Sequence, residues 1–134
     1  NLAKELELDN VVKFLGYRKD IPELMSAIDI LTVPSYAEAF GNVAIEGMAA
    51  AKPVVATNTD GLVEIVIEDE TGLQIPPQNS NALSEALIKL ISDEELRKRF
   101  GEAGLKRVID VFNEDIQMKK LENRFLELIE INSK

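Results

Sequence analysis

Two glutamates, Glu38 and Glu46, stand eight residues apart, and the chain between them passes from a loop into a helix. A carboxylate can accept hydrogen bonds from two hydroxyl groups, which suits the diol of a sugar or a ribose. The residues that open the helix have free backbone N–H groups, and the helix dipole there favours a phosphate. These residues are Ala39, Phe40, Gly41 and Asn42. Two diol-binding carboxylates beside a phosphate-binding helix start predict a site for a nucleotide sugar.

A structural role is the more common one for either glutamate taken alone. A glutamate at a helix start complements the dipole, and a glutamate inside a helix usually lies on the solvent face. The surrounding sequence makes the pair more specific. A small-residue helix is predicted over Gly41–Ala51, and a strand over Pro53–Thr57 that is apolar on both faces, as buried parallel strands are.

Four short apolar segments are predicted to be strands. They are Val11–Leu15, Asp29–Val33, Pro53–Thr57 and Leu73–Ile75. Helices are predicted between them, and this alternation indicates a parallel sheet with crossover helices. Ligands of such sheets bind at the carboxyl ends of the strands, which is where the loop with Glu38 lies.

Helix boundaries are predicted from capping residues. Asp20 and Glu23 have the spacing of a capping box, which predicts that a helix begins after Asp20. A second, short helix is expected over Leu62–Ile67. From about residue 80 to 132 the chain is expected to be helical. The segments are Asn81–Ile91, a helix capped by Ser92 or Asp93 that runs to Val111, and a last helix capped by Asn113.

The last helix has an apolar stripe, which is expected to pack on the sheet or to reach another domain. The stripe consists of Ile116, Leu121, Phe125, Leu128 and Ile129.

Composition excludes several classes of function. With 15 basic and 24 acidic residues, the net charge of −9 disfavours nucleic acid as a partner. The chain has no cysteine and no histidine, so disulfides, thiolate nucleophiles, imidazole catalysis and Cys/His metal sites are excluded within it. Its 134 residues predict a single domain over 1–134. The chain opens with a helical pattern already under way, so we expect it to be a piece of a longer protein.

The motifs together resemble the C-terminal half of family-4 retaining glycosyltransferases, which have the GT-B fold. The signature Glu-x7-Glu of that family is matched by Glu38 and Glu46. Other matching positions are Gly16, Asp29, Pro34–Ser35, Phe40–Gly41, Gly47–Ala49, Pro53–Val55 and Thr71–Gly72. The resemblance covers essentially all of the chain. It implies an α/β fold with a partial Rossmann-like parallel sheet flanked by helices.

The resemblance also implies roles for individual residues. Glu38 would contact the transferred sugar as the catalytic residue, residues 38–42 would hold the donor sugar and diphosphate, and Glu46 would bind the ribose hydroxyls. The nucleobase would lie near Gly16, Tyr17 and Arg18, mainly through backbone contacts. No metal and no cofactor is expected besides the nucleotide-sugar donor.

The resemblance further implies that the diphosphate-binding Arg and Lys and the acceptor domain lie upstream of Asn1. The acceptor, a glycan or a lipid-linked glycan, would bind there, so the isolated chain is expected to bind donor weakly and not to turn over. The full-length protein is expected to be cytoplasmic, peripheral to the inner face of a membrane. An exposed sheet edge would favour a homodimer of the fragment.

Two positions depart from the family pattern. The usual Gly-Gly-x-Pro-Glu is replaced by Asp60-Gly61-Leu62-Val63-Glu64, which leaves the role of that loop open, and Ala39 stands where glycine is usual. Two other functions remain open as well: a non-catalytic binding or regulatory module on the same fold, and an epimerase of similar fold.

Overall fold

The centre of the molecule is a parallel sheet of three strands whose spatial order follows the chain. The structure is a computed structural model that describes residues 2–132, and the surroundings of side chains as far as residue 126. The strands are β1 (Leu31–Val33), β2 (Val54–Thr57) and β3 (Gly72–Ile75). Leu31 is in register with Val54, and Val54 with Gly72. The predicted α/β class with a parallel sheet and flanking helices is confirmed.

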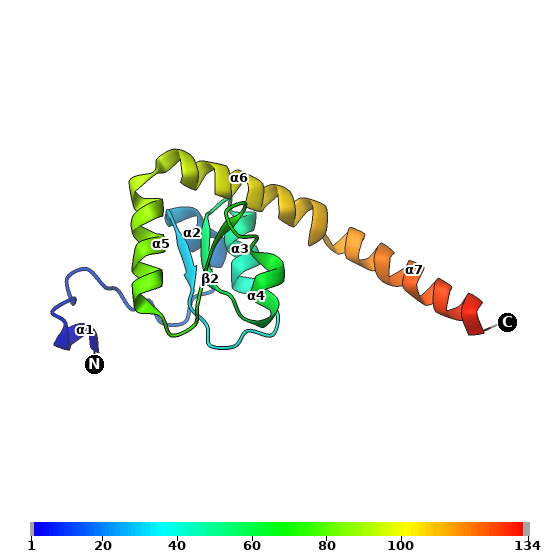
Figure 1. Ribbon diagram of the computed structural model, residues 1–134, viewed down its shortest axis with the longest axis horizontal. Helices are drawn as coiled ribbons and strands as arrows, with labels where there is room; N and C mark the ends of the chain where they lie inside the picture. Colours follow the sequence, from blue (N-terminus) through cyan, green and yellow to red (C-terminus); the bar gives the residue numbers. More distant parts are fainter. Residues whose placement is uncertain (1, 133–134) are drawn as a thin grey trace.

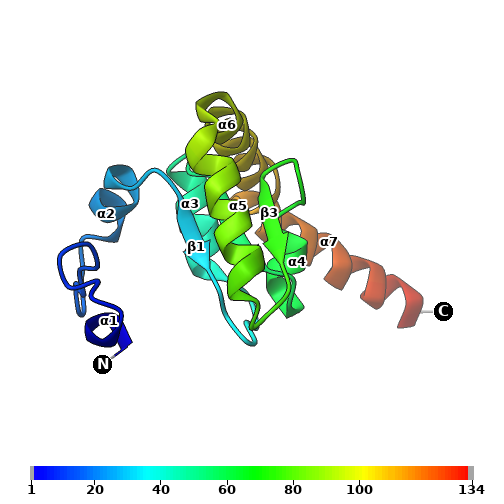
Figure 2. The same ribbon diagram turned by 60° about the vertical axis from the view of Figure 1, so that its left-hand side comes forward.

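The described part of the chain has seven helices. They are α1 (Leu2–Glu5), α2 (Ile21–Ala27), α3 (Asn42–Ala49), α4 (Asp60–Ile65), α5 (Ser80–Ser92), α6 (Glu94–Val111) and α7 (Glu114–Asn132). Helices α3, α4, α5 and α6 pack around the sheet, whereas α1 lies apart from it and α7 projects away (Figures 1 and 2). Six of the seven helices lie where the sequence predicted a helix. The opening helix is shorter than its pattern suggested, because it ends at Glu5.

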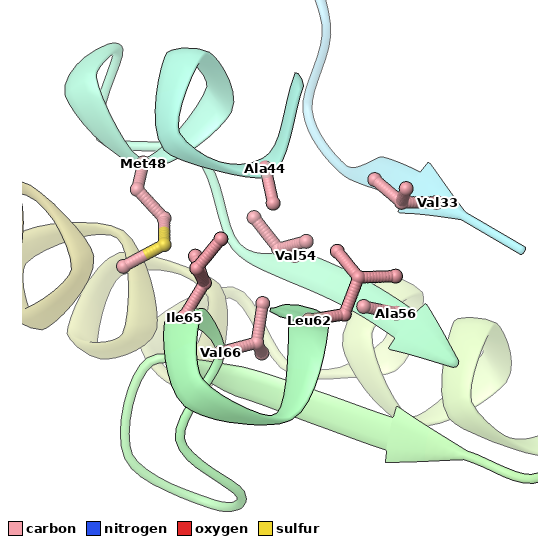
Figure 3. Close-up of a cluster of buried hydrophobic side chains, with 8 residues drawn as sticks. All are labelled: Val33, Ala44, Met48, Val54, Ala56, Leu62, Ile65 and Val66. Atoms are coloured by element: carbon pink, nitrogen blue, oxygen red, sulfur yellow. The ribbon is translucent and has the colours of Figure 1, made fainter. Parts of the chain in front are cut away.

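Strand β2 is buried on both faces, as its apolar sequence predicted. On one face, Val54 and Ala56 meet α3 and α4 (Figure 3). The full cluster is Val33, Ala44, Met48, Val54, Ala56, Leu62, Ile65 and Val66. On the other face, Val55 meets α5 and Phe100 of α6. The two clusters hold the three strands between layers of helix, and so fix where the strand ends lie.

Helix α3 approaches the sheet closely because it carries Gly47 there. A Cβ atom at Gly47 would stand 2.4 Å from the Leu31 Cδ2 atom of β1. Ala44, one turn earlier, is fully buried. Small residues on this side of α3 were predicted to allow such an approach, and they do.

The strand predicted at Val11–Leu15 is wrong. The segment is not in a strand, and its side chains are exposed, with 73% of Val11 and 76% of Phe14 open to solvent. It lies beyond α2, away from β1 (Figure 2). In the described part of the chain β1 pairs only with β2, so the other side of β1 is unpaired, but the segment does not lie against it (Figure 2). A β-prone sequence without a partner cannot satisfy its backbone hydrogen bonds as a strand.

The capping box at Asp20 is also wrong, although α2 begins where expected. The Asp20 side chain makes no cap hydrogen bond. Its carboxylate instead pairs with the Arg18 guanidinium. That hydrogen bond lowers the pKa of the Asp20 carboxyl from its usual value. The Asp20 carboxylate therefore binds the Arg18 guanidinium and does not accept a hydrogen bond from the backbone N–H groups at the start of α2.

The caps at Asp93 and Asn113 are confirmed. The Asp93 Oδ1 atom accepts a hydrogen bond of 2.8 Å from the Leu96 backbone N–H at the start of α6. The Asn113 Oδ1 atom accepts one of 3.0 Å from Asp115 N–H at the start of α7. Each satisfies one backbone donor that the helix itself cannot satisfy.

Replacing Asp93 by alanine is expected to lower the free energy of unfolding by about 1 kcal/mol, because a cap oxygen is lost from an exposed helix start. Urea denaturation followed by circular dichroism measures the change. Glu102→Ala, an exposed position in the middle of α6, is the matched control and should change stability by less than about 0.5 kcal/mol. Equal effects of both substitutions would show that the cap contributes nothing.

Helix α7 continues from α6 and projects from the body (Figure 1). Leu121 is 50% exposed and Phe125 58% exposed. Of the two alternatives for the apolar stripe, packing on the sheet is therefore wrong for these two residues, and contact with another domain stays a prediction. The side chains of Leu128 and Ile129 lie outside the described residues.

Candidate functional site

The loops after the three strands gather at the carboxyl edge of the sheet. Residues 34–41 follow β1, residues 58–59 follow β2, and residues 76–79 follow β3. Helix α6 lies at the opposite edge, because Gly101 contacts Ala51 just before β2. The carboxyl edge is where open parallel sheets bind ligands, and it holds Glu38.

Glu38 lies in this loop, half-buried, with its side chain directed at the start of α3. Its Oε1 atom accepts a hydrogen bond of 3.2 Å from the Gly41 backbone N–H. That distance is at the long end of the normal range, so the bond is a weak one. Glu38 thus meets the α3 N-terminus, where a phosphate was expected from the sequence.

Gly41 is the N-cap residue of α3 and has a φ of +86°, a left-handed conformation that glycine adopts freely. A Cβ atom there would stand 2.8 Å from the Leu62 Cδ2 atom. A larger residue here would strain the backbone and would also displace the ends of the Leu62 and Ile65 side chains. Ala39, Phe40 and Asn42 are exposed around this turn, and Phe40 is 55% exposed.

Glu46 lies one turn beyond Asn42 on the same side of α3, as the spacing predicted. It is exposed and borders a hollow of about 360 Å³ between α2 and α3. The other lining residues are Ile21, Pro22, Met25, Ser26, Ala49 and Ala50. A carboxylate over a partly apolar hollow is suited to a molecule with hydroxyl groups on one side and a flat apolar body on the other.

The segment predicted to lie near a nucleobase leads into the same hollow. Gly16 has a φ of +64°, and Tyr17 is 87% exposed. The Arg18 guanidinium pairs with the Asp20 carboxylate. Ile21, which follows Asp20, lines the hollow that Glu46 borders. The 16–20 loop therefore ends at the start of α2, beside the hollow that Glu46 borders.

The variant loop Asp60–Glu64 forms most of α4, and it touches the Glu38 loop. The Gly61 backbone N–H donates a hydrogen bond of 3.1 Å to the Glu38 carbonyl. Asp60 has a φ of +38°, a region that glycine adopts freely and aspartate tolerates. This explains how aspartate can replace glycine there. Ala39 has no positive φ, so alanine causes no backbone strain at that position.

Sequence reasoning missed Thr57. This residue ends β2, is only 2% exposed, and its hydroxyl donates to the Ser35 carbonyl at 2.7 Å. It thereby connects the carboxyl ends of β1 and β2. The available signal was a single polar residue at the end of the otherwise apolar segment Pro53–Thr57. A buried hydroxyl requires a partner, but the sequence does not name it.

Within the described residues, no cluster of three or more acidic side chains is arranged to hold a metal ion. In the same part of the chain, no helix is both long and apolar enough to cross a bilayer.

A parallel sheet flanked by helices, with a carboxylate loop and a helix N-terminus at its carboxyl edge, belongs to the class of open α/β domains that bind ligands at that edge. Residues 1–107 match the family described as glycosyl transferases group 1. The match covers well over half of the chain, which therefore belongs to the glycosyl transferases group 1 family.

Individual relatives agree with this assignment. An uncharacterized glycosyltransferase of Methanocaldococcus jannaschii is 45% identical over 95 residues, which are 69% of this chain and 27% of that protein. Sucrose-phosphate synthase from Thermosynechococcus elongatus superposes with a TM-score of 0.86 and 37% identity, covering 95% of this chain and 33% of that one.

The Anabaena protein HepE, crystallised with UDP, superposes with a TM-score of 0.89 and 30% identity, covering 93% of this chain and 35% of that one. A second crystal structure of HepE holds UDP-glucose. The chain thus spans about a quarter to a third of the length of the proteins it matches.

Proposed function

We propose that this chain is the donor-binding domain of a glycosyltransferase. The full-length protein would transfer a sugar from a nucleotide-diphosphate sugar to an acceptor, with retention of anomeric configuration and without a metal or other cofactor. The observation that carries the proposal is the contact of the Glu38 carboxylate with the N-terminus of α3, one helical turn from Glu46 and its hollow. Family membership and the UDP-bound relative support it.

In this proposal the nucleoside lies over the hollow between α2 and α3. Glu46 accepts hydrogen bonds from the ribose hydroxyls, and the base lies towards Gly16, Tyr17 and Arg18. The diphosphate receives the backbone N–H groups of residues 40–42, where the helix dipole is positive.

Binding of the donor requires one rearrangement at Glu38. Its carboxylate must release the Gly41 N–H, which then becomes free for the diphosphate. The bond given up is a weak one, at 3.2 Å. The released carboxylate then accepts hydrogen bonds from hydroxyl groups of the transferred sugar, which places the anomeric carbon for reaction.

The rest of the full-length protein supplies what these residues do not. We propose that it carries the cations that stabilise the diphosphate leaving group and the wall that binds a glycan or lipid-linked glycan acceptor. On this view the isolated chain binds donor weakly and does not turn over. We place the full-length protein in the cytoplasm, at the inner face of a membrane.

Titration calorimetry with UDP, GDP and ADP tests the proposal on the full-length protein. One of the three is expected to bind, and Glu46→Gln is expected to weaken that binding about 10-fold, because a charge-assisted hydrogen bond to ribose is worth about 1.5–3 kcal/mol and glutamine keeps part of it. Glu102→Gln, on α6 at the opposite edge, is the matched control and should leave the affinity unchanged.

Absence of binding by a folded sample at millimolar nucleotide would reject the donor site. It would favour the other reading of this fold, a module that binds a partner rather than a nucleotide sugar.

A further inference from the structure

The start of α4 is capped by the loop that carries Glu38. Thr59 is the N-cap residue of α4, yet its side chain makes no cap hydrogen bond. The Gly61 N–H in the first turn instead donates to the Glu38 carbonyl at 3.1 Å. The backbone of Glu38 therefore takes over a role that a threonine at this position ordinarily performs.

The Thr59 hydroxyl is engaged elsewhere. Its Oγ1 atom lies 3.3 Å from the Thr57 Oγ1 atom, and Thr57 in turn donates to the Ser35 carbonyl at 2.7 Å. Because Thr57 has one proton and the Ser35 carbonyl is its nearest acceptor, Thr59 is the donor to Thr57. A continuous hydrogen-bonded chain thus runs from the start of α4 through β2 to the end of β1.

These contacts hold the 35–41 loop at two points. Thr57 fixes the loop where it leaves β1, through Ser35. Gly61 fixes it at Glu38, and a Cβ atom on Gly61 would stand 2.8 Å from the Ala39 carbonyl oxygen. The loop therefore lies directly on the backbone of the α4 start, and Thr59 links the two supports.

We infer that Thr57 is a positioning residue for Glu38. Its buried hydroxyl sets the place of the 35–41 loop through Ser35, and sets the α4 start under Glu38 through Thr59. The part of this inference that concerns sugar transfer rests on the proposed function. Thr57 borders a hollow of about 410 Å³ at the carboxyl edge, but it is only 2% exposed and its hydroxyl is used within the protein, so its role in this account is to position the loop.

The test compares Thr57→Val with Thr57→Ser in the full-length protein. Valine keeps the shape of the side chain and removes the hydroxyl, whereas serine keeps the hydroxyl. We expect Thr57→Val to lower kcat about 10-fold with less than a 2-fold change in KM for the nucleotide sugar, since Glu46 and α3 still hold the nucleotide. Thr57→Ser is expected to restore kcat to within about 2-fold of the unsubstituted protein. These fold-changes correspond to the loss of about one hydrogen bond.

A second readout does not depend on activity. Amide hydrogen exchange at Gly61 is expected to be about 10-fold faster in Thr57→Val, and unchanged in Thr57→Ser, because the loop that accepts its hydrogen bond is released. Gly101, on α6, serves as the internal reference for global unfolding.

The outcomes separate the two proposals. An unsubstituted protein that binds no nucleotide rejects the proposed function, and the Gly61 exchange rates then decide the positioning role by themselves. An active protein in which Thr57→Val keeps full kcat and normal Gly61 exchange overturns the positioning role alone. If Thr57→Val does not fold, Thr59→Val replaces it, with a smaller loss of kcat expected and the same Gly61 readout.

Discussion

Replacing Gly101 by alanine is expected to lower the free energy of unfolding by about 3 kcal/mol, since the new methyl group would meet backbone atoms. A Cβ atom at Gly101 would stand 2.1 Å from the Ala51 carbonyl oxygen and 2.8 Å from its carbonyl carbon. Ala51 cannot move away easily. It lies in a left-handed turn, with a φ of +55°, in which Lys52 N–H donates to the Gly47 carbonyl.

Gly104→Ala is the matched control for this substitution. It lies one turn along the same helix, but a Cβ atom there would meet side-chain atoms of Met48 at 3.2 and 3.4 Å. Methionine adapts to small changes of shape, and alanine gains about 1 kcal/mol over glycine in a helix. The net change in stability is expected to be within about 1 kcal/mol of zero.

Guanidinium denaturation of the two variants and of the unsubstituted protein measures both changes. If Gly101→Ala were no more destabilising than Gly104→Ala, α6 would not pack against the turn at Ala51 as described. Such a result would also place in doubt the position of Phe100, which completes the core on the α5 face.

The largest effect on activity is expected for Glu38→Gln in the full-length protein. Under the proposed function, kcat falls about 100-fold, because the carboxylate makes charge-assisted hydrogen bonds to the transferred sugar that a neutral amide makes weakly. KM for the nucleotide sugar changes little, since the nucleotide is held by Glu46 and the α3 N-terminus. Steady-state kinetics with varied donor separate the two constants.

Glutamine also preserves the acceptor for Gly41 N–H, so the loop is expected to remain in place. Thermal unfolding within about 2 °C of the unsubstituted protein would verify this. Glu85→Gln, on the exposed side of α5, is the control for loss of a negative charge and should leave kcat unchanged. A Glu38→Gln protein with full kcat would exclude Glu38 from catalysis.

The fold between Leu31 and Val111 could be predicted from the sequence because its signals are local. β2 is a run of apolar residues between a proline and a turn, and α6 has its own cap at Asp93. The failures concern signals that depend on something farther away. The segment Val11–Leu15 has strong β propensity, but propensity produces a strand only where the segment lies against another strand and shares its hydrogen bonds. Asp20 had the right spacing for a cap, but Arg18 competes for its carboxylate.

The candidate site was predictable in the same uneven way. Glu38, Gly41 and Glu46 stand out because residue type and spacing alone suggest their chemistry. The contacts of Thr57 and Gly61 with the loop after β1 could not be predicted, because they join segments that meet only when the strands are aligned. Whether the residues at the carboxyl edge act as proposed stays a prediction until the substitutions above are made.

The chain-order arrangement of the three strands has a consequence for how the protein folds. Each strand pairs with the next one in sequence, as Leu31 with Val54 and Val54 with Gly72, so each pairing closes only a short loop. Parallel pairing nevertheless forms more slowly than the contacts within a helix, because each crossover must close before its strands can pair. During synthesis α6 follows all three strands, and it supplies Phe100 to the core on the Val55 face, so the sheet is fully covered only after α6 has emerged.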